Sequence, residues 1–154
     1  MANAASVTLT ATILPDEIAK TISGAMTVTP GTNEKWYYKL TSVLHSAGTA
    51  DLIGGSFLSP ETVGTGHDIV SVSDRVKFLF VKNTDDDDGL VISFAAGTAA
   101  YDLADTIFVG PGESWFGRPH YQTLVSSIHA IAADVDSAGE ATIEVIVAAI
   151  IEDV

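Results

Sequence analysis

The C-terminal half of this sequence repeats one pattern, in which a short apolar or alternating run is followed by a turn and then by another run. The turns are rich in glycine, proline and aspartate, as in the DDDDG of residues 85–89 and the GPGES of residues 110–114. Runs with a period of two between such turns are typical of β-strands and their connections. The pattern therefore restricts the chain to a fold built mainly from strands.

The N-terminal half continues this pattern. Residues 6–13 alternate strictly between apolar residues and serine or threonine, and further strands are predicted over residues 24–29 and 34–44. About nine short strands, with turns at intervals of roughly ten residues, are typical of a β-sandwich or barrel. We expect an all-β fold in a single sandwich domain that spans residues 1–154.

The last run, residues 141–151, predicts two packed sheets. One face of it is wholly apolar, whereas the other is polar at its ends and apolar in its middle, where Ile146 and Ile150 lie. Such a strand is either central in a sheet, or a neighbouring subunit covers its second face. Residues 124–132 fit both helical and strand spacing, and the surrounding strands favour a strand there.

The mean hydropathy of +0.32 is high for a soluble protein. No apolar run approaches the length of about 18 residues that a membrane span needs, and the first basic residue is Lys20, so we expect neither a membrane segment nor a signal peptide. Apolar surface that a partner covers explains the composition better. The sequence therefore predicts an obligate oligomer or a larger assembly.

The formal net charge of -13 argues against nucleic acid as a partner, because phosphate recognition requires clustered lysine and arginine. The charge is uneven: residues 1–83 have a net charge of -1 and residues 84–154 a net charge of -12. Cysteine is absent, which excludes disulfides and thiol chemistry. We expect cationic or neutral partners.

The four aspartates of residues 85–88 are the clearest local feature, followed by Gly89. A calcium loop of the EF-hand type requires an acidic residue at position 12, where the alignment on Gly89 places Ala95. We interpret the segment as a solvated hairpin loop in which Asp-Gly provides a positive φ. Weak cation binding by this loop is the alternative.

The histidines give no metal-binding or catalytic pattern. His45, His67, His120 and His129 are scattered and never fall into a metal-ligand spacing. His67 precedes Asp68, which is able to orient an imidazole, but no nucleophile lies nearby in the sequence, so an exposed histidine is the better interpretation. We predict a protein without catalytic residues, cofactor or metal.

Aromatic residues are the best candidates for a contact surface, because their rings combine a large apolar area with a polar tip. We expect Trp36 and Trp115 in the core, and we expect Tyr37 at the surface because it lies opposite its neighbours in the strand. The candidate interface residues are Tyr37, Tyr38, Tyr121, Ile146 and Ile150.

Several segments carry a resemblance that covers most of the chain: DEIAKTISG of residues 16–24, EKWYYK of 34–39, VKFLFVKN of 76–83, IFVGPGESW of 107–115 and IHAIA of 128–132. In these segments the chain resembles small virion structural proteins of tailed bacteriophages, particularly those that infect cyanobacteria. The resemblance implies a jelly-roll-like β-sandwich of about 8–10 short antiparallel strands. It also implies a decoration or cement protein on the outer capsid surface, assembled in the host cytoplasm.

The first expectation is therefore a capsid cement protein, a homotrimer that binds the major capsid protein and clamps its subunits without chemistry. The alternative is a component of the tail or fibre that binds host-surface glycans through Tyr37, Tyr38 or Tyr121. An enzyme of the cupin type has the least support, since the histidines are scattered.

Overall fold

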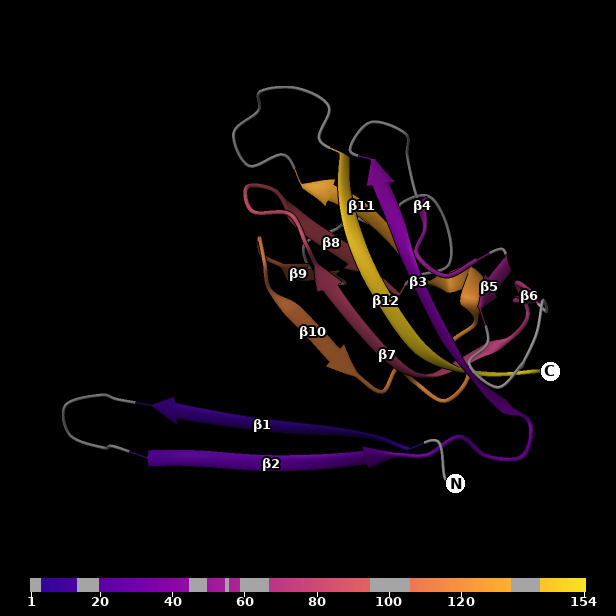
Figure 1. Cartoon of the computed structure of the whole chain (residues 1–154), viewed down its shortest axis with the longest axis horizontal. Coiled ribbons are helices and arrows are strands. Elements are labelled where there is room, and N and C mark those ends of the chain that lie inside the picture. The colour runs from indigo at the N-terminus through magenta and orange to yellow at the C-terminus, as the bar shows by residue number, and fades with distance from the viewer. Residues whose placement is uncertain are drawn as a thin grey trace. The chain divides into compact units, whose positions relative to one another are not determined.

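The structure is a computed structural model, and it describes residues 4–13, 20–44, 50–54, 56–58, 67–94, 106–133 and 142–154. The chain divides into two compact units, Met1–Thr32 and Asn33–Val154. In the described residues, the secondary structure consists of antiparallel strands and one short 3-10 helix, Val125–Ser127 (Figure 1). The prediction of an all-β protein is confirmed.

The N-terminal unit is a β-hairpin of two strands, β1 (Ala5–Ile13) and β2 (Lys20–Val28). The strands are in register along their whole length, so that Val7 faces Met26. Because side chains alternate across a strand, these two residues share a face, and the neighbouring serines and threonines lie on the other. The expectation of one sandwich over residues 1–154 was wrong for this segment, because β1 and β2 pair only with each other among the described strands.

The C-terminal unit is a sandwich of two four-stranded antiparallel sheets (Figure 1). One sheet has the order β10-β7-β12-β3, with β10 at Ser114–Gly117, β7 at Arg75–Asn83, β12 at Thr142–Glu152 and β3 at Glu34–Leu44. The other sheet has the order β4-β11-β8-β9, with β4 at Ala50–Asp51, β11 at His129–Ala133, β8 at Gly89–Ser93 and β9 at Thr106–Val109. Two short strands, β5 (Ser56–Leu58) and β6 (His67–Ile69), form a separate ribbon.

The core lies between the two sheets and is formed by the inward faces of both. The central strand β12 contributes a wholly buried row: Ile143, Val145, Val147, Ala149 and Ile151. Opposite them, β8 and β11 contribute Leu90, Ile92, Ala130 and Ala132, all without exposed surface. Of the two alternatives for the last strand, the central position is observed, since β12 pairs with β7 on one side and with β3 on the other.

The acidic segment of residues 85–88 connects the two sheets, because β7 belongs to one sheet and β8 to the other. The prediction of a hairpin loop with a positive φ at Gly89 was therefore wrong; among the described glycines only Gly112 has a positive φ. A side chain at position 89 would meet the ring of Phe108 on the paired strand β9, so that this exposed ring would have to move.

Residues 110–114 form the tight turn that the sequence predicts. The Glu113 N–H donates to the Gly110 carbonyl over 3.1 Å, and Gly112 has a φ of 67°. Pro111 followed by a residue with positive φ is the signature of a type II turn. This turn also connects the two sheets, since β9 and β10 lie in different ones.

The side chain of Asn83, at the end of β7, forms hydrogen bonds with both connections that cross from one sheet to the other. Its fully buried side chain donates from Nδ2 to the Asp88 carbonyl at 2.7 Å and to the Gly110 carbonyl at 3.2 Å. Its Oδ1 accepts the Asp85 N–H at 3.0 Å, and the Asp85 carbonyl in turn accepts the Gly112 N–H at 2.7 Å. One amide side chain therefore fixes the geometry of two loops, because its donors and acceptor face backbone groups of both.

The segment that the sequence left ambiguous contains both kinds of structure. Its first part is the 3-10 helix, whose Val125 is buried, and its second part is the strand β11. The favoured interpretation as a strand is confirmed only for residues 129–132 of the segment.

Candidate functional site

The outer face of the sheet β10-β7-β12-β3 carries apolar side chains in the positions where an antiparallel sheet exposed to water normally carries polar ones. In one row across the four strands, Phe116 pairs with Phe80, Phe80 with Ala148, and Ala148 with Tyr38. In the adjacent row, Ile146 pairs with Leu40. We call these residues the outer apolar face: Tyr38, Leu40, Phe80, Phe116, Ile146 and Ala148.

Part of the outer apolar face is open to solvent. Tyr38 is 57% exposed and Leu40 is 53% exposed, and the other four members are half-buried. Contiguous apolar side chains of this size are unusual at the surface of a soluble monomer. The arrangement offers an aromatic area for binding, which is bordered by the exposed side chain of Lys82, the residue paired with Ile146 on β7.

The next row of the same face is closed by its own side chains. Ile150 pairs with Phe78 on one side and with Trp36 on the other. The rings of Trp36 and Phe78 meet edge to face, with centroids 6.2 Å apart and an interplanar angle of 81°. Ile150 has no exposed surface, so its selection as an interface residue was wrong for the chain by itself.

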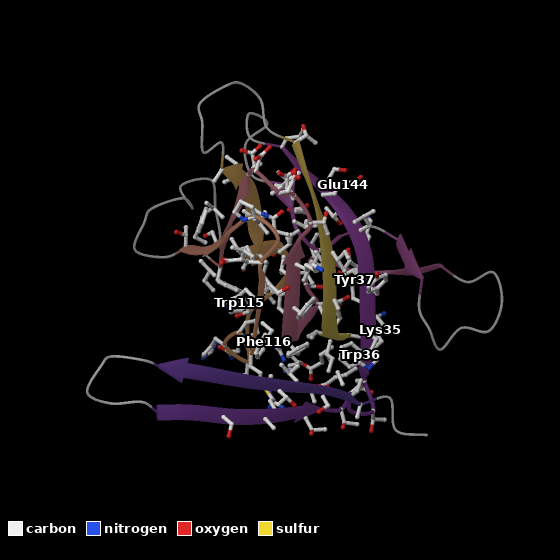
Figure 2. All side chains as sticks on the ribbon, turned by 60° about the vertical axis from the view of Figure 1, so that its left-hand side comes forward. Lys35, Trp36, Tyr37, Trp115, Phe116 and Glu144 are labelled. Carbon is white, nitrogen blue, oxygen red and sulfur yellow. The ribbon has the colours of Figure 1, made fainter. Side chains whose placement is uncertain are left out.

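Tyr37 lies on the inner face of β3 and has no exposed surface, so the expectation that it is a surface residue was wrong (Figure 2). Its hydroxyl accepts the Gly54 N–H over 3.4 Å, and burial raises the pKa of that hydroxyl. Both faces of β3 carry aromatic or aliphatic residues, and the opposing sheet covers the face of Tyr37 and Val43.

The two tryptophans have different environments. Trp115 packs against the core and its ring lies 5.7 Å from that of Phe94, as expected for a core residue. Trp36 is half-buried and lies on the same outward side of β3 as Tyr38, so its assignment to the core was wrong. Figure 2 labels Trp36 and its neighbours along β3.

Tyr121 is 63% exposed and lies outside the strands, in the connection that follows β10. Its carbonyl accepts a hydrogen bond from Lys77 Nζ over 3.3 Å, and its ring lies 4.4 Å from that of His120. Of the five candidate interface residues, Tyr38 and Ile146 belong to the outer apolar face, and Tyr121 is a separate exposed ring.

The sequence analysis did not select Phe80, Phe116 or Leu40 for the interface. The signal was present in residues 78–80, where three consecutive large apolar residues require that both faces of the strand carry apolar side chains. In β7, Leu79 faces the core, and Phe80 consequently points to the other side.

The basic residues of the sandwich all lie in one sheet or directly beside it. Lys35 and Lys39 lie in β3, residues 75, 77 and 82 lie in β7, and Arg118 directly follows β10. On this sheet, Lys77 Nζ lies 2.7 Å from Glu152 Oε2, and the hydrogen bond from Lys77 lowers the pKa of Glu152. The described strands β4, β8, β9 and β11 contain neither lysine nor arginine.

One carboxylate of the acidic segment accepts hydrogen bonds from the backbone of the same segment. Asp85 Oδ1 accepts the N–H groups of Asp87 and Asp88, each at 2.9 Å, and these backbone donors lower the pKa of Asp85. Among the described residues, no group of three histidine, aspartate or glutamate side chains is placed to hold a metal ion. His45 lies outside the described residues, as do the side chains of His67 and Asp68.

In the part of the chain that the structure describes, no helix has the length and apolar character required to cross a membrane. Comparison of the chain with protein-family models, with curated proteins and with solved structures gives no match.

Proposed function

We propose that this chain is a non-enzymatic structural protein of a virion shell, which decorates the capsid as a homo-oligomer and stabilises it through added interfaces. The observation that carries the proposal is the outer apolar face. An aromatic surface on a regular sheet provides area for a protein contact.

The strand order supports the same proposal. We infer a jelly roll, because the eight sandwich strands, counted in chain order, pair as 1-8-3-6 in one sheet and as 2-7-4-5 in the other. Jelly rolls of eight strands occur in viral capsid proteins, in lectins and in cupins. This support is an analogy between folds, and the function itself is argued from the surface.

The partners in this proposal are other copies of the chain and the major capsid protein. A protein that binds the assembled lattice and not the free subunits stabilises the lattice by mass action. The resemblance of the sequence to virion structural proteins of tailed phages selects the capsid as the lattice. The location that follows is the outer surface of the head.

Binding to purified capsids tests the proposal. The full chain is mixed with capsids that lack it, the particles are sedimented, and the copies bound per capsid are measured by quantitative mass spectrometry. Saturation at a copy number set by the capsid symmetry, with density on the outer surface in cryo-microscopy, is the expected result. Binding of a few copies at one vertex or no binding at all overturns the proposal.

A second candidate, binding of host glycans by a tail or fibre component, is favoured by the exposed rings of Tyr38 and Tyr121. Exposed tyrosines are able to stack on the apolar face of a sugar. Glycan-array binding that is lost in both Tyr38→Ala and Tyr121→Ala, together with a low copy number per virion, supports this candidate over the capsid protein.

A further inference from the structure

The acidic segment ends in Asp88-Gly89, the only Asp-Gly dipeptide in a sequence that contains no Asn-Gly. Aspartate is most prone to isomerisation when glycine follows it, because glycine has no Cβ that hinders attack by its own backbone nitrogen. The dipeptide lies where the connection between the two sheets enters β8, which begins at Gly89. The sequence therefore places its one isomerisation-prone dipeptide at the end of a connection between sheets.

Isomerisation proceeds in two steps and needs no reagent other than water. The Gly89 nitrogen forms a bond to Cγ of Asp88, and the nitrogen proton and the carboxyl OH leave as water, which gives a succinimide ring. Addition of water at the Cγ carbonyl restores aspartate. Addition at the main-chain carbonyl gives isoaspartate, in which the main chain runs through Cβ and Cγ and the former main-chain carbonyl becomes the free carboxylate. The composition of the chain is therefore unchanged.

Two hydrogen bonds hold the backbone of Asp88 in the folded chain. Its N–H donates to Asp85 Oδ1 at 2.9 Å, and its carbonyl accepts a bond from Asn83 Nδ2 at 2.7 Å. That carbonyl and the Gly89 nitrogen belong to the same planar peptide unit, so the bond from Asn83 also fixes the nitrogen. Ring closure requires this unit to rotate until the nitrogen faces Cγ, and the rotation takes Asp88 out of the strand and helix regions of backbone conformation.

The sheet holds the same peptide unit from its other side. Gly89 is buried, and it is paired with Ala133 on β11. The ring of Phe108 on β9 occupies the position that a side chain at residue 89 would take. The peptide unit is therefore able to rotate only after the connection opens, and the population of the open state sets the rate of the reaction.

We propose that Asp88 is a site of spontaneous isomerisation, and that the Asn83 side chain controls the rate by holding the Asp88-Gly89 peptide unit in place. This inference goes beyond the proposed function, because it assigns a covalent modification that limits the lifetime of the connection. Isoaspartate replaces the carbonyl to which Asn83 donates and lengthens the main chain between β7 and β8 by one methylene. The modified connection consequently loses the bond that slowed the reaction.

The neighbouring aspartates provide an internal comparison. Asp86 and Asp87 are exposed, whereas Asp88 is half-buried. Each of the two exposed residues is followed by another aspartate, whose Cβ hinders the attack of the backbone nitrogen. If exposure alone determined the reaction, Asp86 and Asp87 would react first. We expect the modification at Asp88 instead.

Incubation in water enriched in heavy oxygen tests the proposal, because each opening of the ring adds one solvent oxygen to the product. The full chain is held at neutral pH and digested, and fragmentation mass spectrometry locates the label and distinguishes isoaspartate from aspartate. A sample unfolded in guanidinium chloride gives the intrinsic rate. We expect label at Asp88, incorporated at least about 100-fold more slowly in the folded chain. Equal rates in the two samples, or label at Asp86 or Asp87 instead, overturn the proposal.

Two substitutions separate the role of Asn83 from a loss of overall stability. Asn83→Ala removes the bond to the Asp88 carbonyl and should accelerate labelling of the folded chain at least about tenfold. Ile151→Ala removes buried atoms from the core at the opposite end of β12 and leaves both bonds to Asp88 in place. It should change the rate less than about threefold, because it favours global unfolding and not the local opening. Equal acceleration by the two substitutions contradicts the role of Asn83.

The unsubstituted chain provides a measurement that does not depend on the folding of a variant. The labelling rate is followed in a series of guanidinium chloride concentrations below the unfolding transition. Opening of one connection exposes little surface, so the rate should be nearly independent of the denaturant in this range. A rate that rises as steeply as the unfolded fraction means that Asp88 reacts only in the unfolded chain, and this result overturns the proposal.

Discussion

Replacing Asn83 by alanine should destabilise the sandwich by about 4 kcal/mol, because this one side chain holds both connections that cross between the sheets. The substitution removes two good bonds from Nδ2, at 2.7 Å to Asp88 O and 3.2 Å to Gly110 O, and one to Oδ1 from Asp85 N at 3.0 Å. Each is worth about 1 kcal/mol net, and a buried carbonyl left without a donor costs about 1 kcal/mol more. Domains of this size have total stabilities of about 5–15 kcal/mol.

Urea unfolding followed by tryptophan fluorescence measures this loss, with all variants at the same protein concentration. A decrease of 4 kcal/mol corresponds to a melting temperature lower by about 10 °C. The matched variant is Asn83→Asp. It keeps the shape of the side chain and the oxygen that accepts the Asp85 N–H, but it places a second oxygen where Nδ2 donates to the Asp88 and Gly110 carbonyls. It should be less stable than Asn83→Ala at neutral pH, because the buried carboxylate repels them and has lost its donors.

The pH dependence of the stability of Asn83→Asp tests whether the buried carboxylate is the cause of its lower stability. Protonation restores one donor, and the folded chain binds this proton more tightly than the unfolded chain does. Its deficit relative to the wild type should therefore be largest at neutral pH and shrink as the pH falls from the raised pKa of the folded chain to the ordinary carboxyl pKa of the unfolded chain. A loss below about 1 kcal/mol in Asn83→Ala, or a deficit of Asn83→Asp that grows in acid, would refute the reasoning.

Three further changes test local features. Gly112→Ala should cost about 1 kcal/mol, because the φ of 67° is strained for a residue with a side chain, and a shift in the urea midpoint measures it. The pKa of Asp85 is lowered in the folded chain, so the Asp85 carboxylate stabilises the fold above its unfolded pKa, and this contribution is lost as the pH falls toward its folded pKa. Between neutral and acid pH, the free energy of unfolding of Asp85→Ala should therefore decrease less than that of the wild type. Lys77→Met should raise the pKa of Glu152 toward its ordinary value, and an NMR titration of that carboxyl checks this.

Local patterns were sufficient to predict the elements that local chemistry determines. Alternation over residues 143–151 predicts the buried face of β12, and Pro111-Gly112 predicts the turn, because both depend on neighbours in the chain. Alternation on β3 correctly separates Tyr37 from Trp36 and Tyr38. The alternation does not predict which of the two apolar faces of β3 packs against the opposing sheet. The face that does not pack against it becomes part of the outer apolar face.

Connections between sheets depend on pairing between distant segments, which short-range patterns do not contain. The acidic segment of residues 85–88 has the composition of a hairpin loop, yet β7 pairs with β10 and β12 while β8 pairs with β9 and β11. In the same way, the alternation of residues 6–13 predicts a strand but not its partner. The partner is β2, and the resulting hairpin is a unit separate from the sandwich.

The placement of every sandwich lysine and arginine on or directly beside one sheet makes the charge distribution of the sandwich asymmetric. The strands of that sheet and Arg118 together carry six basic and three acidic residues, and the other described residues of the sandwich unit include nine acidic residues and no lysine or arginine. A neighbouring field therefore exerts a torque on the molecule before any contact forms, and it turns the aromatic side toward negative surfaces. At 0.1 M salt this effect reaches about 10 Å, so it acts only on charges within a few water layers of the molecule.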